Sequence, residues 1–168
     1  MSLILRPFGP ADEAPALAAR AEFEGSGFDF LPFDFDPRVP WAEWIALMER
    51  YRRGIDLPEN RTRAAFLAAE VDGQLVGRAS IRFELNDFLV VRGGHIGYDV
   101  ISAFRGRGYA TAILRQSIVI VRNEGVTDVL VTCDDSNVGS IKVIERCGGV
   151  LEKIAFDEDG VAFRRYWI

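Results

Sequence analysis

Apolar residues follow two spacings along this chain, one typical of helices and one typical of strands. The clearest helical spacing runs from 109 to 123, where apolar side chains recur every three or four residues. Similar spacing predicts further helices over 11–23, 40–53 and 136–147. Alternating or β-branched apolar runs predict strands over 2–6, 64–71, 74–85, 94–101, 128–133, 150–156 and 161–167.

Turn residues join these runs into a recognisable fold class. Asp72-Gly73 between two apolar runs predicts a β-hairpin with a type I′ turn, because both central residues of that turn need a positive φ. Residues 157–160 turn a second hairpin at the end of the chain, whereas the prolines and glycines of 25–37 argue against a long helix or a central strand there. We expect one α/β domain over 1–168, of the α+β kind, with a mixed and mostly antiparallel sheet flanked by helices.

Composition narrows the classes of partner. The 168 residues, 49% of them hydrophobic, can bury a full core. A net charge of −5 and a pI near 5.0 argue against nucleic acid or an anionic membrane as the main partner. No run of 18 apolar residues and no signal peptide occur, so we expect a cytoplasmic protein. Cys133, Cys147 and the single His95 lack metal-ligand spacing, so we expect no metal site.

A glycine-rich turn carries the main functional signal. A strand ends near Val100, a short loop follows, and Gly106 and Gly108 precede the clearest helix of the chain. Amides at the start of a helix have no internal partners, so such a turn can bind a pyrophosphate. The glycines could also serve only to bend the chain. A P-loop is absent, and a dinucleotide-binding fingerprint would need a small residue where Thr111 stands, which leaves that interpretation as a weaker alternative.

Two motifs together resemble the GNAT acetyltransferases. Their donor-binding signature, Arg/Gln-x-x-Gly-x-Gly/Ala after a strand, is matched by Arg105, Gly108 and Ala110. A second block, Asn-x-x-Ser/Ala before a helix and a glycine, is matched by Asn137 and Ser140. The order of the predicted elements is similar to that family over nearly the whole chain. The resemblance does not bring a particular substrate with it.

This resemblance implies that acetyl-CoA is the cofactor and that an acetyl group passes to a primary amine of a small molecule, peptide or protein by direct attack on the thioester. The alternative is a non-catalytic module of the same fold that binds acyl-CoA. GNAT domains often form homodimers, so that state is an expectation as well. The residues that the resemblance assigns to the donor are Val100, Ile101, Arg105, Gly106, Arg107, Gly108, Tyr109, Ala110 and Asn137.

Proton transfer needs a base for the amine and an acid for the leaving thiolate. His95 is a candidate base, because the resemblance places it where related enzymes often have a glutamate and its ordinary pKa of about 6.5 suits the task. Glu84 or Asp99 could serve instead. Family members often use a tyrosine as the acid, but Ile144 occupies that position, so Ser140 becomes the candidate. Each of these residues could also have a purely structural role.

The resemblance implies an acceptor site between the two N-terminal helices and the loop that joins them. Aromatic and acidic residues interleave over 28–36, and Asp29, Phe33 and Asp34 could bind a cationic amine with an apolar body. The same segment could instead be a loop that its phenylalanines fix to the core. Glu84 completes the predicted acceptor residues. It alternates outward with Arg78 and Arg82 along one strand, and such a series could orient an acceptor carboxylate if it borders the cleft.

Overall fold

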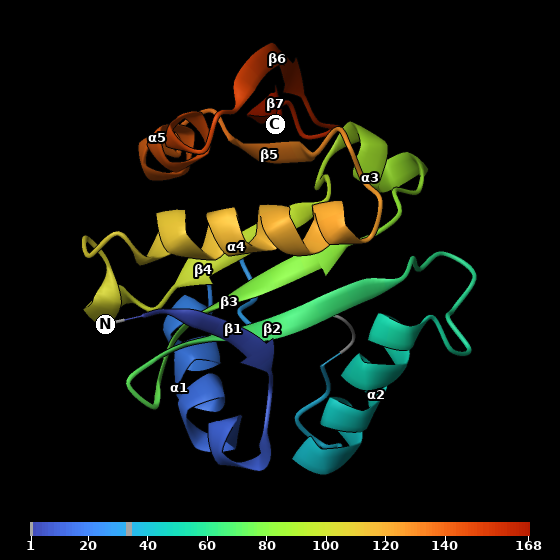
Figure 1. The fold of residues 1–168 in the computed structure, drawn as a ribbon, viewed down its shortest axis with the longest axis vertical. Helices are drawn as coiled ribbons and strands as arrows, with labels where there is room; N and C mark the ends of the chain where they lie inside the picture. The colour runs from blue at the N-terminus through green and yellow to red at the C-terminus, as the bar shows by residue number, and fades with distance from the viewer. Residues whose placement is uncertain (1, 33–34) are drawn as a thin grey trace.

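The computed structural model of this protein describes residues 2–32 and 35–168 (Figure 1). Two short 3₁₀ turns, at Pro10–Asp12 and Ser102–Phe104, accompany the helices and strands. The helices are α1 (Glu13–Phe23), α2 (Trp41–Arg53), α3 (Asp87–Val91), α4 (Tyr109–Asn123) and α5 (Val138–Arg146). The strands are β1 (Ile4–Pro7), β2 (Ala64–Val71), β3 (Gln74–Arg82), β4 (Ile96–Val100), β5 (Leu130–Asp134), β6 (Val150–Phe156) and β7 (Ala162–Trp167).

The strands form two antiparallel sheets. The first has the order β1-β2-β3-β4 and the second the order β5-β7-β6. An isolated bridge joins Gly94, just before β4, to Val131 of β5, and beyond it the two sheets diverge. The hairpin between β2 and β3 turns at Asp72 and Gly73 with φ values of 51° and 77°, which confirms the predicted type I′ geometry. The α/β prediction is confirmed, and β2, β3 and β4 pair antiparallel rather than in the parallel units that a dinucleotide-binding fold needs.

Two hydrophobic cores cover the two faces of the first sheet. On one face α4 packs between the two sheets, and its buried face includes Ile113 and Leu114 (Figure 1). On the other face α1 and α2 cover the sheet, where Trp44 packs edge-on against Phe66 of β2 at a centroid distance of 5.7 Å. Because both faces are covered, β2 and β3 are buried almost throughout their length.

The structure differs from the predicted elements mainly after β3. The second strand of the hairpin ends at Arg82 rather than at residue 85, and the unpredicted helix α3 follows. The side chain of Asn86 accepts a hydrogen bond from the Leu89 amide at 2.9 Å, which is the contact of a helix N-cap. The strand predicted over 94–101 is shorter, because Gly94 and His95 leave it towards β5. None of the helices within the described residues has the length and apolar character needed to span a membrane.

Candidate functional site

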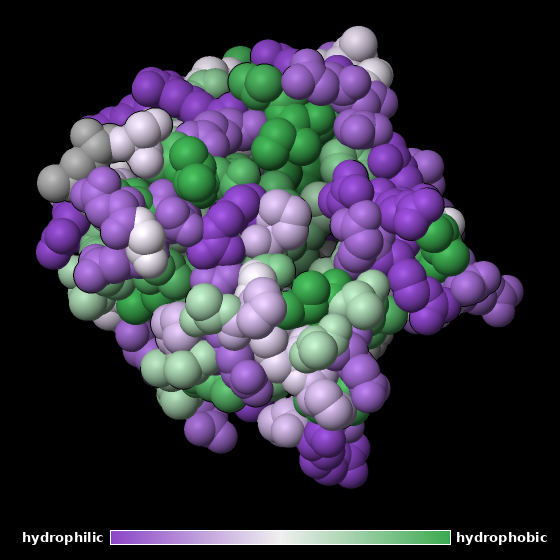
Figure 2. Space-filling model, turned by 60° about the horizontal axis from the view of Figure 1, so that its bottom comes forward, coloured by the Kyte–Doolittle hydropathy of each residue, from purple (hydrophilic) through white to green (hydrophobic). Residues whose placement is uncertain are grey.

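A cleft of about 920 Å³ opens where β4 and β5 diverge. The start of α4 and the start of α5 form its sides, and the loop after α1 borders it. On the face drawn in Figure 2, apolar side chains gather above and below the middle, and hydrophilic side chains lie between and around them. Residues predicted to act at the site that do line the cleft are Val100, Arg105, Gly106, Gly108, Tyr109, Ala110, Asn137 and Ser140.

The turn before α4 presents its backbone to this cleft. Gly106 and Gly108 have φ values of 76° and 82°, a conformation that glycine adopts without strain. A Cβ atom at either position would meet nothing within 4 Å, so the turn faces open space. In the described part of the chain, the amides of residues 106–108 donate to no acceptor, and the first helical hydrogen bond runs from the Ala112 amide to the Gly108 carbonyl. Several amides therefore remain available for an anion at the positive end of the helix.

The main chain of β4 divides its hydrogen-bonding groups between two edges. The Ile101 amide donates to the Val76 carbonyl at 3.0 Å, so it belongs to the pairing with β3 and not to the cleft. Because hydrogen-bonded pairs alternate in an antiparallel ladder, the amides of Tyr98 and Val100 point to the opposite edge. The Val100 carbonyl accepts a hydrogen bond from Nε of Arg105 at 3.0 Å. The predicted pair of donor-binding residues on this strand is thus split, with Val100 in the cleft and Ile101 outside it.

Two hydroxyl side chains, one from the start of α5 and one from β4, lie in the cleft. The side chain of Asn137 caps this helix by accepting a hydrogen bond from the Ser140 amide at 3.0 Å. Tyr98 of β4 lies beside Ser140, and both residues line the cleft. The Tyr98 hydroxyl is buried and has no hydrogen-bond partner within the described residues. Burial raises the pKa of Tyr98, while the nearby Ser140 hydroxyl acts in the other direction. Ser140 therefore lies beside a tyrosine. This tyrosine comes from β4 and not from the helix on which the family often has one.

Asp99 is the acidic side chain of β4 that faces the cleft. It lines the cleft, and its Oδ2 lies 2.6 Å from a guanidinium nitrogen of Arg78, whose side chain is only 4% exposed. Burial raises the pKa of Asp99 to about 6, and the positive charges of Arg78 and Arg105 act against that rise. A carboxylate with a pKa close to neutrality can accept a proton and release it again under physiological conditions.

His95 lies beneath the cleft rather than in its lining. The residue is 6% exposed, and its Nδ1 accepts a hydrogen bond from the Leu130 amide at 2.9 Å. Its own amide donates to the Leu130 carbonyl at 2.8 Å, so the ring and the backbone both help to join β4 to β5. Burial lowers the pKa of His95 below its ordinary value. These contacts describe a histidine that holds the two sheets together, and its part in catalysis stays a prediction.

The two predicted acceptor residues that the structure describes both lie outside the cleft lining. The carboxylate of Asp29 faces outward, where it accepts a hydrogen bond from the Leu31 amide and lies 3.6 Å from Nε of Arg20. Glu84 is exposed beyond the end of β3 and lies outside the cleft lining. Phe33 and Asp34 lie outside the described residues. Among the predicted donor-binding residues, Arg107 also turns away, because its guanidinium donates to the Ala103 carbonyl.

The cleft also contains one aromatic residue of the predicted acceptor segment and a cysteine to which sequence reasoning assigned no role at the site. Phe28 of the aromatic segment lines the cleft and lies 5.1 Å from the guanidinium of Arg78, measured to the ring centroid. Cys133 lines it too, and burial raises the pKa of its thiol to about 11, so the thiol stays protonated near neutral pH. In the described part of the chain, no group of three or more His, Cys, Asp and Glu side chains could hold a metal ion.

Comparisons with known proteins agree with this architecture. A family model described as an acetyltransferase (GNAT) domain matches residues 2–150. The structure of Mycobacterium smegmatis RimJ in complex with CoA-disulfide superimposes with a TM-score of 0.73 at 22% identity, covering 99% of this chain and 81% of that one. The structure of yncA from Salmonella typhimurium with acetyl-CoA has a TM-score of 0.68 at 16% identity, covering 100% and 94%.

A third structure, a ribosomal-protein-alanine N-acetyltransferase from Brucella melitensis, has a TM-score of 0.68 at 21% identity and covers 98% of both chains. No curated protein sequence matches the chain. Likeness at such identities shows the fold, whereas the family model matches most of the sequence itself. The chain therefore belongs to the GNAT acetyltransferase domain family, and it is an acetyltransferase.

Proposed function

We propose that this protein is an N-acetyltransferase that transfers the acetyl group of acetyl-CoA to a primary amine by direct attack on the thioester. The observation that carries the proposal is the row of unpartnered amides at residues 106–108, which opens into a cleft beside the unpaired edge of β4. The structures of RimJ with CoA-disulfide and of yncA with acetyl-CoA support the choice of donor.

The cleft fits the parts of this donor chemically. Its pyrophosphate is an anion, and the glycine turn supplies backbone N–H groups, the positive end of α4 and the guanidinium of Arg105. Its amide-rich arm needs main-chain partners, and the outward amides of Tyr98 and Val100 are such groups. When bound, acetyl-CoA supplies an activated acetyl group. An amide of β4 directed at the thioester carbonyl would stabilise the negative charge that develops there.

Asp99 is the residue that we assign as the general base. Only the free fraction of an amine can attack, at a lysine-like pKa of about 10.4, and the attacking nitrogen must then lose a proton to a base as the new C–N bond forms. Asp99 lines the cleft and has its pKa raised to about 6, whereas His95 is absent from the lining and its Nδ1 already accepts a hydrogen bond. The geometry favours Asp99 over the other two candidates, since Glu84 lies outside the cleft as well.

Ser140 and Tyr98 are the residues that we assign to the departing thiolate. They come from different elements, lie beside each other and line the same cleft. A buried tyrosine hydroxyl stays protonated at neutral pH, so it can donate a proton or a hydrogen bond to sulfur. Ser140→Ala and Tyr98→Phe together should therefore slow the reaction more than either change alone.

Donor binding and turnover test the proposal in two steps. A donor at about 100 times its Kd stabilises the protein by about 2.7 kcal/mol, which raises the Tm of a domain of this size by roughly 5 to 10 °C. Acetyl-CoA and CoA should produce this shift, whereas NADH and ATP should not. With acetyl-CoA present, a panel of amines should then release free thiol.

Two glycines at opposite ends of α4 provide a matched pair of variants. Gly108 and Gly125 both have a positive φ, and at both a Cβ would meet nothing within 4 Å. Valine at either position thus introduces similar backbone strain, but only Gly108→Val fills the cleft. We expect Gly108→Val to lose the donor shift and Gly125→Val to keep it. Loss of the shift in both variants, or in neither, would argue against donor binding at this turn.

A further inference from the structure

One face of β3 carries a row of three polar side chains, of which two are buried and the third, Arg82, lines the cleft. Arg78, Ser80 and Arg82 are two residues apart, so their side chains project from the same face of the strand. Ser80 is 0% exposed, and its hydroxyl has no hydrogen-bond partner within the described residues. The Nε atom of Arg78 is buried without a hydrogen-bond partner there as well. Buried polar groups are normally satisfied, so this row has unused capacity for a polar ligand.

Gly97 leaves the space above this row open. It pairs with Ser80 across the β3–β4 ladder. A Cβ at Gly97 would lie 3.7 Å from Nη1 of Arg78, 3.7 Å from Nη1 of Arg82 and 3.9 Å from Cβ of Ser80. The backbone of Gly97 is not in the left-handed region, so its conformation does not require glycine. What the missing side chain provides is room for a group in contact with two guanidinium ions at once, and Gly97 lines the cleft.

The charge at this place is not balanced by the protein. Arg78 has Asp99 as its counterion, whereas in the described part of the chain no carboxylate pairs with Arg82. Nη1 of Arg82 only reaches the carbonyls of Gly93 and Gly94, at 3.3 and 3.4 Å. Burial lowers the pKa of Arg82 to about 10, and the positive charges of Arg78 and Arg61 act in the same direction. Burying a cation with so few partners is costly, and an anionic ligand would offset that cost.

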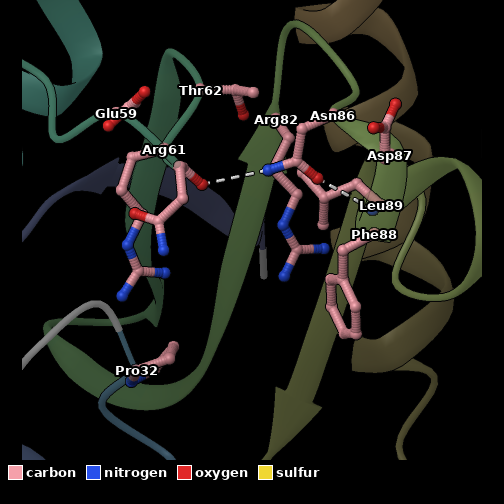
Figure 3. Close-up of a pocket in the computed structure, with 10 residues that line it drawn as sticks. Pro32, Glu59, Arg61, Thr62, Arg82, Asn86, Asp87, Phe88 and Leu89 are labelled. Carbon is pink, nitrogen blue, oxygen red and sulfur yellow. Dashed lines mark hydrogen bonds between the residues drawn. The ribbon is translucent and has the colours of Figure 1, made fainter.

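Arg82 also connects the cleft to a second pocket. This pocket has a volume of about 540 Å³, and Arg82 and Phe88 line both cavities. In Figure 3 the guanidinium groups of Arg61 and Arg82 point to the same side of the pocket, and the carboxylates of Glu59 and Asp87 lie at its opposite rim. The two arginines therefore place positive charge on one side of this smaller pocket, away from the acidic side chains of its rim.

The assigned base is close to this cationic site. Asp99 lies two residues from Gly97 along β4, roughly 7 Å by the rise of a strand, and on the same face. A ligand whose anionic group lies over Gly97 thus needs only a short chain to bring another of its atoms to Asp99. A small amine that carries a carboxylate has these dimensions.

We propose that the acceptor is a small amine bearing a carboxylate, and that Arg82, together with Arg78, binds this carboxylate over Gly97. This inference rests on the proposed N-acetyltransferase activity and names its substrate class. The planar, two-pronged guanidinium group suits carboxylate recognition, and a site built to pair a buried charge discriminates strongly against neutral analogues. The carboxylate could also belong to a dicarboxylic acyl group on the donor, so the experiment has to separate the two sources.

The experiment compares amino acids with their carboxamides as acceptors, using acetyl-CoA and the release of free thiol. For each pair the ratio of kcat/KM for the acid to that for the amide is measured in the wild type, Arg82→Gln, Arg82→Lys and Gly97→Ala. Arg122→Gln, an exposed arginine at the other end of α4, is the control. The Tm shift with acetyl-CoA is measured in every variant, together with the affinities for acetyl-CoA and succinyl-CoA.

We expect the wild type to prefer the acids and Arg82→Gln to reduce the ratio by roughly 10- to 100-fold, which corresponds to one charged hydrogen bond. Most of that change should appear in KM. Arg82→Lys should retain part of the preference, since the charge remains without the planar pair of donors. Gly97→Ala should also reduce it, and because its Cβ makes only ordinary contacts this variant should fold normally. The acetyl-CoA shift should be unchanged throughout.

Several outcomes would overturn the inference. A ratio that Arg82→Gln leaves unchanged, amides that serve as well as acids, or a donor-binding protein that releases thiol with none of the amino acids would each do so. A loss of succinyl-CoA affinity in Arg82→Gln with an unchanged acid-to-amide ratio would place the carboxylate on the acyl group instead. The absence of any acetyl-CoA shift in the wild type would be a failure of the proposed function, which is a different result.

Discussion

The role of Asp99 can be tested through the pH dependence of the reaction. Its pKa of about 6 predicts that roughly one molecule in ten has the carboxylate ionised at pH 5 and nine in ten at pH 7. The free fraction of an acceptor amine also rises tenfold per pH unit below its own pKa. Between pH 5 and pH 7, kcat/KM should therefore rise about 1000-fold, of which about 100-fold comes from the amine and about tenfold from Asp99.

The assay measures thiol release at saturating acetyl-CoA and low acceptor concentration, from pH 5 to pH 8.5. A logarithmic plot of kcat/KM should bend near pH 6, from a slope of two to a slope of one. Asp99→Asn should be slower by about 10² to 10⁴ and should show a slope of one throughout. The Tm of each protein is followed over the same range so that unfolding is not mistaken for titration.

Two control variants separate Asp99 from the other candidates. Glu84→Gln removes an exposed carboxylate outside the cleft, and His95→Asn keeps an acceptor for the Leu130 amide while removing the imidazole. Both should retain the bend near pH 6. A bend that disappears in His95→Asn but survives in Asp99→Asn would refute the assignment and return the role to the histidine. A slope of one in the wild type would exclude a titrating base in this range.

Three further predictions concern stability. Arg78→Met leaves the partly buried carboxylate of Asp99 without its counterion, so unfolding in urea should show a loss of about 3 to 5 kcal/mol. A smaller loss would mean that water already solvates the pair. Gly94→Ala should destabilise the protein severely, because φ is 62° and a Cβ would overlap a backbone carbonyl. The control Gly27→Ala has a φ of 75° but open space around it, so it should cost only its backbone strain. Equal losses in Tm for the two variants would contradict this prediction. Burial favours the protonated form of Asp12, but hydrogen bonds from Arg6 and from a backbone amide together hold the pKa of Asp12 below its ordinary value. The stability that Asp12 contributes is therefore present above about pH 4 and lost as the pH falls. Asp12→Asn should reduce this loss of Tm at acid pH.

Local patterns in the sequence were sufficient for most of the fold. The 109–123 helix and the Asp72-Gly73 hairpin depend on spacing and φ preferences that a few adjacent residues determine, and both occur with the predicted bounds or turn. Helix α3 was missed because its five residues are too few to show a helical period. Its Asn86 cap was the one available signal, and it is weak without a following apolar face.

The site depended on information that spacing does not contain. Whether an amide of β4 faces β3 or the cleft follows from register, which is why Ile101 was assigned with Val100 although their amides point to opposite edges. The contact between Tyr98 and Ser140 joins elements about forty residues apart. His95 has the residue type of a base, but its burial against Leu130 appears only when the two sheets are placed together.

The alternating edges of β4 have a consequence for amide hydrogen exchange. The amides of Gly97 and Asp99 belong to the pairing with β3 and should exchange slowly, whereas the intervening amide of Tyr98 faces the gap between the sheets and should exchange fast. The slowly exchanging amides of Gly97 and Asp99 thus serve as a reference, and the amide of Tyr98 between them serves as a reporter of the gap. A molecule that occupies the gap would slow only the reporter, so this single strand records occupancy without any turnover.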